Sequence, residues 1–249
     1  MAVDEALLAS AIETGPPTLR FYRWSGPWLS LGYRQRLDAE RLAACARAGI
    51  GVVRRTTGGR AVLHGEDLTY AVVAREEALP AGLGATYAFV AEALQEALAA
   101  LGVTAEPAPR SAAVPPEVFD CFAEPATDEL CAGGRKLIGS AQRRAGGGVL
   151  QHGSIRLKPD PPAVRSAAGF EPGAATSLSE LGVEIRVEAL ISACREAFAR
   201  HLSADLVAGG FSAFEFELTR EREFARTAEL PILIANPPRG GSRVQLDGR

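Results

Sequence analysis

The sequence predicts an α+β fold: a mixed β-sheet core flanked by helices, followed by a smaller C-terminal helical part. Strand-like and helical segments are interspersed over the first 158 residues, without the regular strand–helix alternation of a parallel doubly wound sheet. After a proline-rich stretch at 159–162 the pattern becomes helical. We therefore divide the chain into a sheet-based core (1–158), a C-terminal helical part (159–238) and a disordered tail rich in glycine and arginine (239–249).

The predicted helices have recognisable ends. Asp38 suits the N-cap of one helix and Gly49 its C-terminal stop, because a short acceptor side chain and a residue tolerant of positive φ are favoured at these positions. Gly102 closes the clearest amphipathic helix in the same way. Helical periodicity covers residues 4–12, 38–48, 85–101 and 187–202.

The predicted strands are short runs rich in β-branched and aromatic residues, bounded by turn residues. They cover residues 18–24, 28–33, 50–54, 68–74, 119–122, 137–144 and 149–157. Several prolines between 104 and 118 predict an irregular connection. Residues 54–60 are so rich in glycine and arginine that they predict a loop.

Composition excludes several classes of protein. A net charge of −3 over 249 residues gives no reason to expect nucleic-acid or membrane-surface attraction, and no stretch approaches the ~18 apolar residues of a spanning helix. The four cysteines are widely spaced and match no metal or disulfide pattern. Because the first residues also lack the basic region of a signal peptide, we expect a cytoplasmic globular protein with free thiols and no metal site.

Only two of the 27 basic residues are lysines, Lys136 and Lys158. A GC-rich coding bias explains the excess of arginine. Under such a bias, a retained lysine can mark a site where arginine does not serve, because an ammonium can lose its proton and a guanidinium cannot. Lys136 starts a strand-like run that contains Gly139, and glycine inside a strand indicates a bulge or the close approach of a ligand. The alternative is an exposed lysine on a hairpin.

A loop rich in arginine and glycine, residues 54–64, is a candidate binding segment. Its paired glycines let the backbone approach a ligand closely, and its arginines supply charge for a carboxylate or phosphate. The spacing is neither a dinucleotide fingerprint nor a P-loop, and a tight turn with solvated arginines is the alternative. His64 at the end of this loop and His152 in a later strand are either functional or hydrogen-bonded structural histidines.

Cys121 differs from the other cysteines. Cys45 and Cys194 lie in helical patterns among alanines, where they fit small core positions, and Cys131 has no companion. Cys121 lies at the edge of an irregular segment upstream of Lys136. A thiol is a good nucleophile only as the thiolate, which a nearby ammonium favours. Whether the two side chains meet is not decided by the sequence.

The order of these segments resembles that of the lipoate/biotin protein ligase superfamily, and is most similar to its cysteine-dependent octanoyltransferases (LipM type). Residues 54–64 resemble the family's Arg-Arg-x-x-Gly-Gly-Arg-x-Val-x-His loop, 134–142 its Gly-Arg-Lys-x-x-Gly-Ser-Ala-Gln strand, and 150–155 its Leu-Gln-His-Gly-Ser-Ile strand. Cys121 occupies the place of the family's nucleophile. The resemblance covers most of residues 1–158.

The resemblance implies that residues 1–158 form an acyltransferase catalytic core that needs no cofactor. Octanoyl would pass from acyl carrier protein to Cys121 as a thioester, and then to a lysine of a lipoyl domain such as the glycine-cleavage H protein, in lipoate biosynthesis. Lys136 would be the second catalytic residue. An exposed basic rim with Arg143 and Arg144 would suit the acidic carrier. The residues that would bind substrate are Arg54, Arg55, Thr57, Gly58, Gly59, Arg60, His64, Gly139, Ser140, Ala141, His152 and Gly153.

Three other functions stay open at this point. A lipoate–protein ligase would adenylate free lipoate with ATP and Mg²⁺ on the same loop and lysine, but it needs no cysteine, so Cys121 is the discriminating residue. An octanoyl amidotransferase would use the same cysteine with a lipoyl domain as donor. A catalytically dead binding module on the same fold is disfavoured because both Cys121 and Lys136 are retained.

Overall fold

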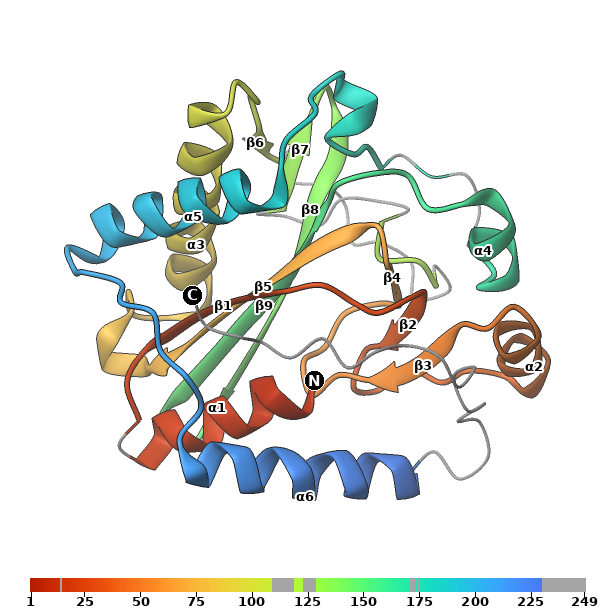
Figure 1. Ribbon diagram of the computed structural model, residues 1–249, viewed down its shortest axis with the longest axis horizontal. Coiled ribbons are helices and arrows are strands. Elements are labelled where there is room, and N and C mark those ends of the chain that lie inside the picture. Colours follow the sequence, from red (N-terminus) through yellow and green to blue (C-terminus); the bar gives the residue numbers. More distant parts are fainter. Residues whose placement is uncertain (14, 109–118, 123–128, 171–172, 174, 230–249) are drawn as a thin grey trace.

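The computed structural model describes the chain except residues 14, 109–118, 123–128, 171–172, 174 and 230–249 (Figure 1). The helices are α1 (Ala2–Glu13), α2 (Ala39–Arg47), α3 (Leu83–Ala100), α4 (Pro162–Ala167), α5 (Val187–Leu202) and α6 (Ala213–Glu229). The strands are β1 (Thr18–Tyr22), β2 (Trp28–Leu31), β3 (Gly51–Arg54), β4 (Val62–His64), β5 (Asp67–Arg75), β6 (Glu106–Pro107), β7 (Leu130–Ala132), β8 (Arg135–Ala145) and β9 (Gly148–Arg156).

The strands form two sheets that meet at the β4–β5 connection. The larger sheet has the order β1-β5-β9-β8-β7-β6 and is antiparallel throughout. The smaller sheet has the order β3-β2-β4, with β2 parallel to β3 and antiparallel to β4. The predicted combination of mixed sheets and flanking helices is therefore confirmed.

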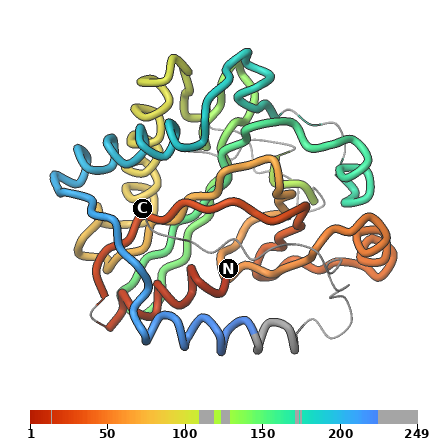
Figure 2. The backbone as a smooth tube through the Cα atoms, viewed as in Figure 1, coloured from red at the N-terminus to blue at the C-terminus, as the bar shows by residue number. Residues whose placement is uncertain are grey.

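Helices cover both faces of the larger sheet (Figures 1 and 2). Alternate residues of β5 point to opposite faces, as the pleat requires. Tyr70 and Val72 belong to a core cluster that includes residues of α3 and α5, such as Leu94 and Phe198. Val73 belongs to a separate cluster with α1, and α6 packs along the outer side of α1.

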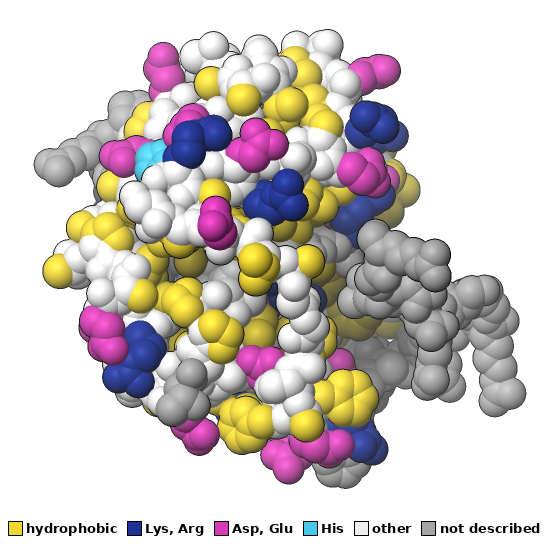
Figure 3. All heavy atoms as spheres, turned by 60° about the vertical axis from the view of Figure 1, so that its left-hand side comes forward, with side chains coloured by type: hydrophobic (Ala, Val, Ile, Leu, Met, Phe, Trp, Pro, Cys, Tyr) yellow, Lys and Arg dark blue, Asp and Glu magenta, His cyan; other side chains and the backbone are white. Residues whose placement is uncertain are grey.

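The helices that follow residue 159 therefore pack on the sheet-based core. Leu190, Cys194 and Phe198 of α5 are fully buried in the cluster that fills one face of the larger sheet. Acidic and basic side chains are interspersed over the face on this side of the molecule (Figure 3), as expected for a net charge near zero. Among the described residues, no helix is long and apolar enough to cross a membrane.

The predicted helix boundaries agree with the structure where caps define them. The Asp38 side chain accepts a hydrogen bond from the backbone N–H of Arg41 at 2.7 Å, and Gly49 has a φ of +68° after the last turn of α2. Gly102, with a φ of +79°, follows α3 in the same way. Both glycines occupy conformations that a side chain would disfavour.

The prediction of a strand at residues 119–122 is wrong. Only Asp120 forms a bridge, to Ala61, and the following two residues turn. The three-residue strands β4 and β7 and the two-residue β6 were not predicted, because segments this short carry no periodicity and are defined by their partners. The proposed disordered tail, 239–249, lies outside the described residues.

Candidate active site

A small, open pocket lies between the smaller sheet and the middle of strands β8 and β9. The predicted loop, both predicted strands and Cys121 all contribute to it. The residues that line it are Met1, Ser30, Arg55, Gly59, Val62, His64, Thr69, Cys121, Gly139, Ser140, Ala141, His152, Gly153 and Ser154.

Cys121 and Lys136 lie together at this cavity. Lys136 Nζ lies 3.5 Å from Cys121 Sγ and 2.6 Å from the carbonyl oxygen of Cys121. Its third contact is Oε2 of Glu129, at 2.5 Å. The lysine side chain is fully buried, whereas Cys121 is partly exposed. This arrangement is the one that thiolate chemistry needs, since a fixed ammonium stabilises negative charge on the adjacent sulfur.

The electrostatics of Lys136 result from opposing effects. Burial, the largest single influence, lowers the pKa of the ammonium because a charge is costly to desolvate. The negative charges of Cys121 and Glu129, together with the hydrogen bonds to them, outweigh burial, so that the pKa of Lys136 is raised above its ordinary value. The lysine is therefore held in its charged form.

Backbone contacts fix the position of Cys121. Its N–H donates to the carbonyl oxygen of Ala61 at 2.8 Å, and the Ala61 N–H donates to the carbonyl oxygen of Phe119 at 3.1 Å. Asp120 Oδ1 accepts the N–H of Phe122 at 2.7 Å, which closes a tight turn around the cysteine. Ala61 of the arginine–glycine loop thus holds the backbone of Cys121 in place, although the two segments are far apart in sequence.

Two strand glycines make room for this arrangement. A Cβ on Gly139 would lie 3.1 Å from Lys136 Cε and 3.2 Å from Phe122 Cζ. A Cβ on Gly153 would lie 2.5 Å from the carbonyl oxygen of Gly139 and 2.6 Å from the Tyr70 ring. The close approach predicted for Gly139 is therefore made by protein side chains. Beside these glycines, Ser140 Oγ is hydrogen-bonded to the Tyr70 hydroxyl at 2.6 Å.

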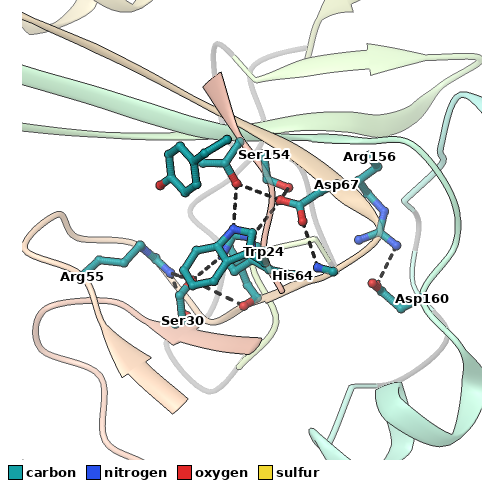
Figure 4. A network of polar contacts seen from close by, with 12 residues as sticks. Trp24, Ser30, Arg55, His64, Asp67, Ser154, Arg156 and Asp160 are labelled. Atoms are coloured by element: carbon teal, nitrogen blue, oxygen red, sulfur yellow. Dashed lines mark hydrogen bonds and ion pairs between the residues drawn. The ribbon is translucent and has the colours of Figure 1, made fainter. Parts of the chain in front are cut away.

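His64 is the centre of a buried polar chain (Figure 4). Its Nε2 lies 2.7 Å from Ser30 Oγ and its Nδ1 lies 2.8 Å from Asp67 Oδ2. The ring also stacks on Trp24, with centroids 4.3 Å apart. Both ring nitrogens are therefore engaged within the protein, so the structure favours the structural role for this histidine.

Asp67 anchors that chain as a carboxylate. Its Oδ2 also accepts the hydroxyl of Ser154 at 2.7 Å and that of Thr69 at 3.1 Å, and its Oδ1 accepts the N–H of Gly65 at 3.0 Å. Burial opposes the charged form, but the positive charge that His64 can carry and these hydrogen bonds prevail and lower the pKa of Asp67 to about 2.

His152 has an equivalent arrangement on the other side of the cavity. Its Nε2 lies 2.7 Å from Thr57 Oγ1 and its Nδ1 lies 3.2 Å from Asp4 Oδ2. Asp4 also accepts from Arg20 at 2.6 Å and from the Tyr22 hydroxyl at 3.0 Å. Burial lowers the pKa of His152, so the ring stays neutral and Thr57 ties the loop to β9.

The loop arginines bind backbone carbonyls. Arg55 is buried and donates to the backbone oxygens of Ser30, Gly58 and Arg60 and to Ser30 Oγ, at 2.7 to 3.1 Å. Arg54 donates to the carbonyl oxygens of Gly32, Tyr33 and Gln35. The alternative of solvated arginines is therefore wrong for both residues, which instead hold the loop in shape.

The other predicted loop residues follow from that shape. The carbonyl groups of Gly58 and Arg60 accept from Arg55, and Arg60 itself is half-buried. Gly59 has a φ of +88°. Its carbonyl group packs on Gly32, where an added Cβ would lie 1.9 Å from the carbonyl oxygen of Gly59. Only glycine fits at these two positions.

The predicted exposed rim at Arg143 and Arg144 needs correction. Arg144 is held by Glu76 at 3.2 Å, by the carbonyl oxygen of Gly82 at 2.9 Å and by Thr86 Oγ1 at 2.7 Å. Its guanidinium therefore connects β8 to the start of α3 by hydrogen bonds. Arg143 contributes a contact of 3.5 Å to the carbonyl oxygen of Thr56. Neither arginine is a freely solvated charge.

Sequence reasoning missed the buried acids and hydroxyls of the site. Asp67 lies three residues after His64, and this spacing was a usable signal for a carboxylate–histidine pair. Asp4 lies 148 residues before His152, and no local pattern connects them. Among the described residues, no group of His, Cys, Asp and Glu side chains is arranged to hold a metal ion.

Comparison with known proteins agrees with this fold and site. Residues 1–199 match the family model of the lipoyl protein ligase A/B catalytic domain. The structure of Ta0514, a putative lipoate protein ligase from Thermoplasma acidophilum, superimposes with a TM-score of 0.76 at 26% identity, covering 90% of this chain and 88% of that one. The chain belongs to the lipoyl protein ligase A/B family.

Relatives within the family narrow the assignment. The octanoyltransferase LipM of Kyrpidia tusciae is 38% identical over 89% of both chains, and that of Symbiobacterium thermophilum is 40% identical over 84% of both. The octanoyltransferase LipM of Moorella thermoacetica is 50% identical over 63% of this chain, a match that spans 60% of that protein. Within its family, the chain belongs with the LipM octanoyltransferases.

Proposed function

We propose that this protein transfers an octanoyl group from acyl carrier protein, through a thioester on Cys121, to a lysine of a lipoyl domain. The observation that carries the proposal is the contact between Lys136 Nζ and Cys121 Sγ, with Cys121 lining an open pocket. The names of the relatives, octanoyltransferase LipM, support the acyl group. A solved lipoylation system from Thermoplasma acidophilum pairs a related ligase with an E2 lipoyl domain, which supports the acceptor.

In the first half-reaction the Cys121 thiolate attacks the carbonyl carbon of the donor thioester. The new S–C bond forms as the S–C bond to the carrier breaks, and Lys136 gives its proton to the departing thiolate. The acyl chain then extends into the cavity beside Gly139 and Gly153. Because neither glycine carries a side chain, Lys136, Phe122 and Tyr70 can pack against the strand backbone beside the cavity.

In the second half-reaction the acceptor amine attacks the acyl-Cys121 carbonyl. Lys136, now neutral, accepts a proton from the attacking amine, the C–N bond forms, and Cys121 leaves as the thiolate beside the regenerated ammonium. An arginine at position 136 could not carry out this cycle, because a guanidinium does not lose its proton in proteins. This is consistent with the rarity of lysine elsewhere in the chain.

The hydrogen-bonded groups around His64 and His152 have a structural role in this scheme. His64 and His152 hold β2, the arginine–glycine loop and β9 around the cavity, so their part in substrate binding is to shape its walls. The reaction needs reduced thiols, and all four cysteines are free, which supports a cytoplasmic setting.

The transfer is tested with a purified lipoyl domain as acceptor. Octanoyl–acyl carrier protein without ATP is expected to add one octanoyl group to the acceptor lysine, as measured by intact mass. The structure of lipoate-protein ligase A bound with ATP has a TM-score of 0.74 to this chain at 25% identity. A parallel incubation with ATP and free octanoate therefore tests the ligase reaction. Modification that requires ATP and free octanoate, and does not occur with the carrier, would overturn the transferase proposal.

A further inference from the structure

Glu129 contacts the catalytic lysine and has no role in the chemistry described so far. Its Oε2 lies 2.5 Å from Lys136 Nζ, and its side chain is 6% exposed. Glu129 directly precedes β7, whose residue Cys131 pairs with Lys136 of β8. The pairing of these two strands therefore brings the carboxylate to the ammonium.

Each of the three N–H groups of the Lys136 ammonium has an acceptor close to Nζ. An ammonium has three N–H groups. Two of them have close acceptors, the Cys121 carbonyl oxygen at 2.6 Å and Glu129 Oε2 at 2.5 Å. The remaining contact is Cys121 Sγ at 3.5 Å. With the first two N–H groups fixed, the third is left for the sulfur.

We propose that Glu129 is a positioning residue that keeps Lys136 charged in a water-poor site and directs its third N–H at the Cys121 sulfur. The inference rests on the proposed function. A buried lysine without a counter-charge tends to give up its proton, because desolvation disfavours the charged form. Neutral Lys136 could neither stabilise the Cys121 thiolate nor protonate the departing carrier thiolate, so acylation depends on the carboxylate.

Other titratable groups lie near Lys136, but the ion pair of its ammonium is with Glu129. Burial raises the pKa of Asp120 and of Cys131, and Asp120 Oδ1 accepts the backbone N–H of Phe122. Lys136 Nζ and the Arg156 guanidinium both contact the Phe122 ring, at 4.8 and 5.1 Å from its centroid, so a second cation lies nearby. Glu129 is therefore the acid placed to balance the ammonium before Cys121 ionises.

The test follows acylation of Cys121 by octanoyl–acyl carrier protein as a function of pH, with thioester formation measured by intact mass. Glu129→Gln keeps the shape of the side chain and removes its charge. The alkaline limb of the profile, where Lys136 loses its proton, is therefore expected to shift to lower pH by roughly 1–3 pH units. Glu129→Asp keeps the charge but shortens the side chain, so its limb is expected to stay in place while the rate falls.

Glu5→Gln is the matched control. Glu5 is a buried carboxylate 3.1 Å from Arg222 that lies outside the cavity lining. This variant is expected to lose stability without moving the alkaline limb. A purely structural role for Glu129 would make Glu129→Gln behave in the same way, and an unmoved limb would overturn the proposal.

Two further outcomes separate the possible failures. If Glu129→Gln does not fold, Glu129→Asp gives the answer, because a displaced limb or an undiminished rate in that variant contradicts the positioning role. If the unaltered protein forms no thioester, the proposed function fails and this inference fails with it. If it forms one and the profiles of all variants coincide, only this inference fails.

Discussion

Lys136 Nζ lies 3.5 Å from the sulfur of Cys121 and 2.6 Å from the carbonyl oxygen of the same residue. The lysine therefore contacts both the thiol of Cys121 and the backbone that carries it. A change at either residue is expected to disturb the distance between ammonium and sulfur. The first predictions concern this pair.

Replacement of Lys136 by arginine is expected to slow turnover strongly. Arginine can keep the charge beside Glu129 but cannot pass a proton between donor thiol and acceptor amine, so the rate should fall by roughly 10²- to 10⁴-fold. Lys158→Arg is the control, since Lys158 is exposed and is the only other lysine. Octanoyl transfer to a lipoyl domain is measured for each. Near-normal turnover by Lys136→Arg would show that no proton passes through this residue.

Gly139→Ala is expected to slow acylation of Cys121. The new methyl group would lie 3.1 Å from Lys136 Cε and 3.2 Å from Phe122 Cζ, so that the lysine side chain or the phenyl ring must shift beside Cys121. Gly26→Ala is a useful comparison, because no atom lies within 4 Å of the added Cβ although its φ of +85° is itself unfavourable. We expect Gly26→Ala to cost stability and Gly139→Ala to cost activity. The opposite pattern would contradict the crowding seen at Gly139.

Asp67→Asn is expected to destabilise the fold and to leave the thioester chemistry possible. A neutral amide cannot accept from His64, Thr69 and Ser154 as the carboxylate does, and each buried donor left unpaired costs about 1–3 kcal/mol. Urea unfolding at neutral pH measures the loss. A variant as stable as the parent protein would show that His64 does not depend on this anchor.

Acid is expected to weaken the fold in two stages. Because the pKa of His152 is lowered from 6.5 by burial, the unfolded chain binds its proton first, and stability is lost as the pH falls below about 6.5. Asp67, with a pKa of about 2 against an ordinary 3.8, adds a second loss as the pH falls below 3.8. Urea unfolding across this range measures both. His152→Gln should lack the first stage, and a parent protein with constant stability between neutral pH and pH 5 would contradict the assignment.

The sequence predicted the parts of this site that carry their own signal. Lys136 was conspicuous because lysine is rare in the chain, and Gly59 because paired glycines after arginines are unusual. Glu129 carried no such signal, since it lies in a stretch that contains other acids. It comes to lie beside Lys136 only when β7 pairs with β8. Asp4 likewise meets His152 only through the packing of α1 on the sheet.

Helices with caps and long amphipathic faces were equally predictable. The Asp38 cap and the buried face of α5 are local properties of the sequence. The failed strand at residues 119–122 shows the limit. Asp120 forms a single bridge to Ala61, and the backbone then turns around Cys121. The Asp120 side chain and the arginine–glycine loop stabilise this turn, and strand propensity reports neither contact.

The central claim is that Cys121 carries the acyl group, and intact mass after incubation with octanoyl–acyl carrier protein without ATP tests it most directly. The account predicts one octanoyl adduct that hydroxylamine removes, its absence in Cys121→Ala, and its presence in Cys131→Ala, which alters a buried thiol nearby. An unmodified parent protein, or an adduct that persists in Cys121→Ala, would contradict it.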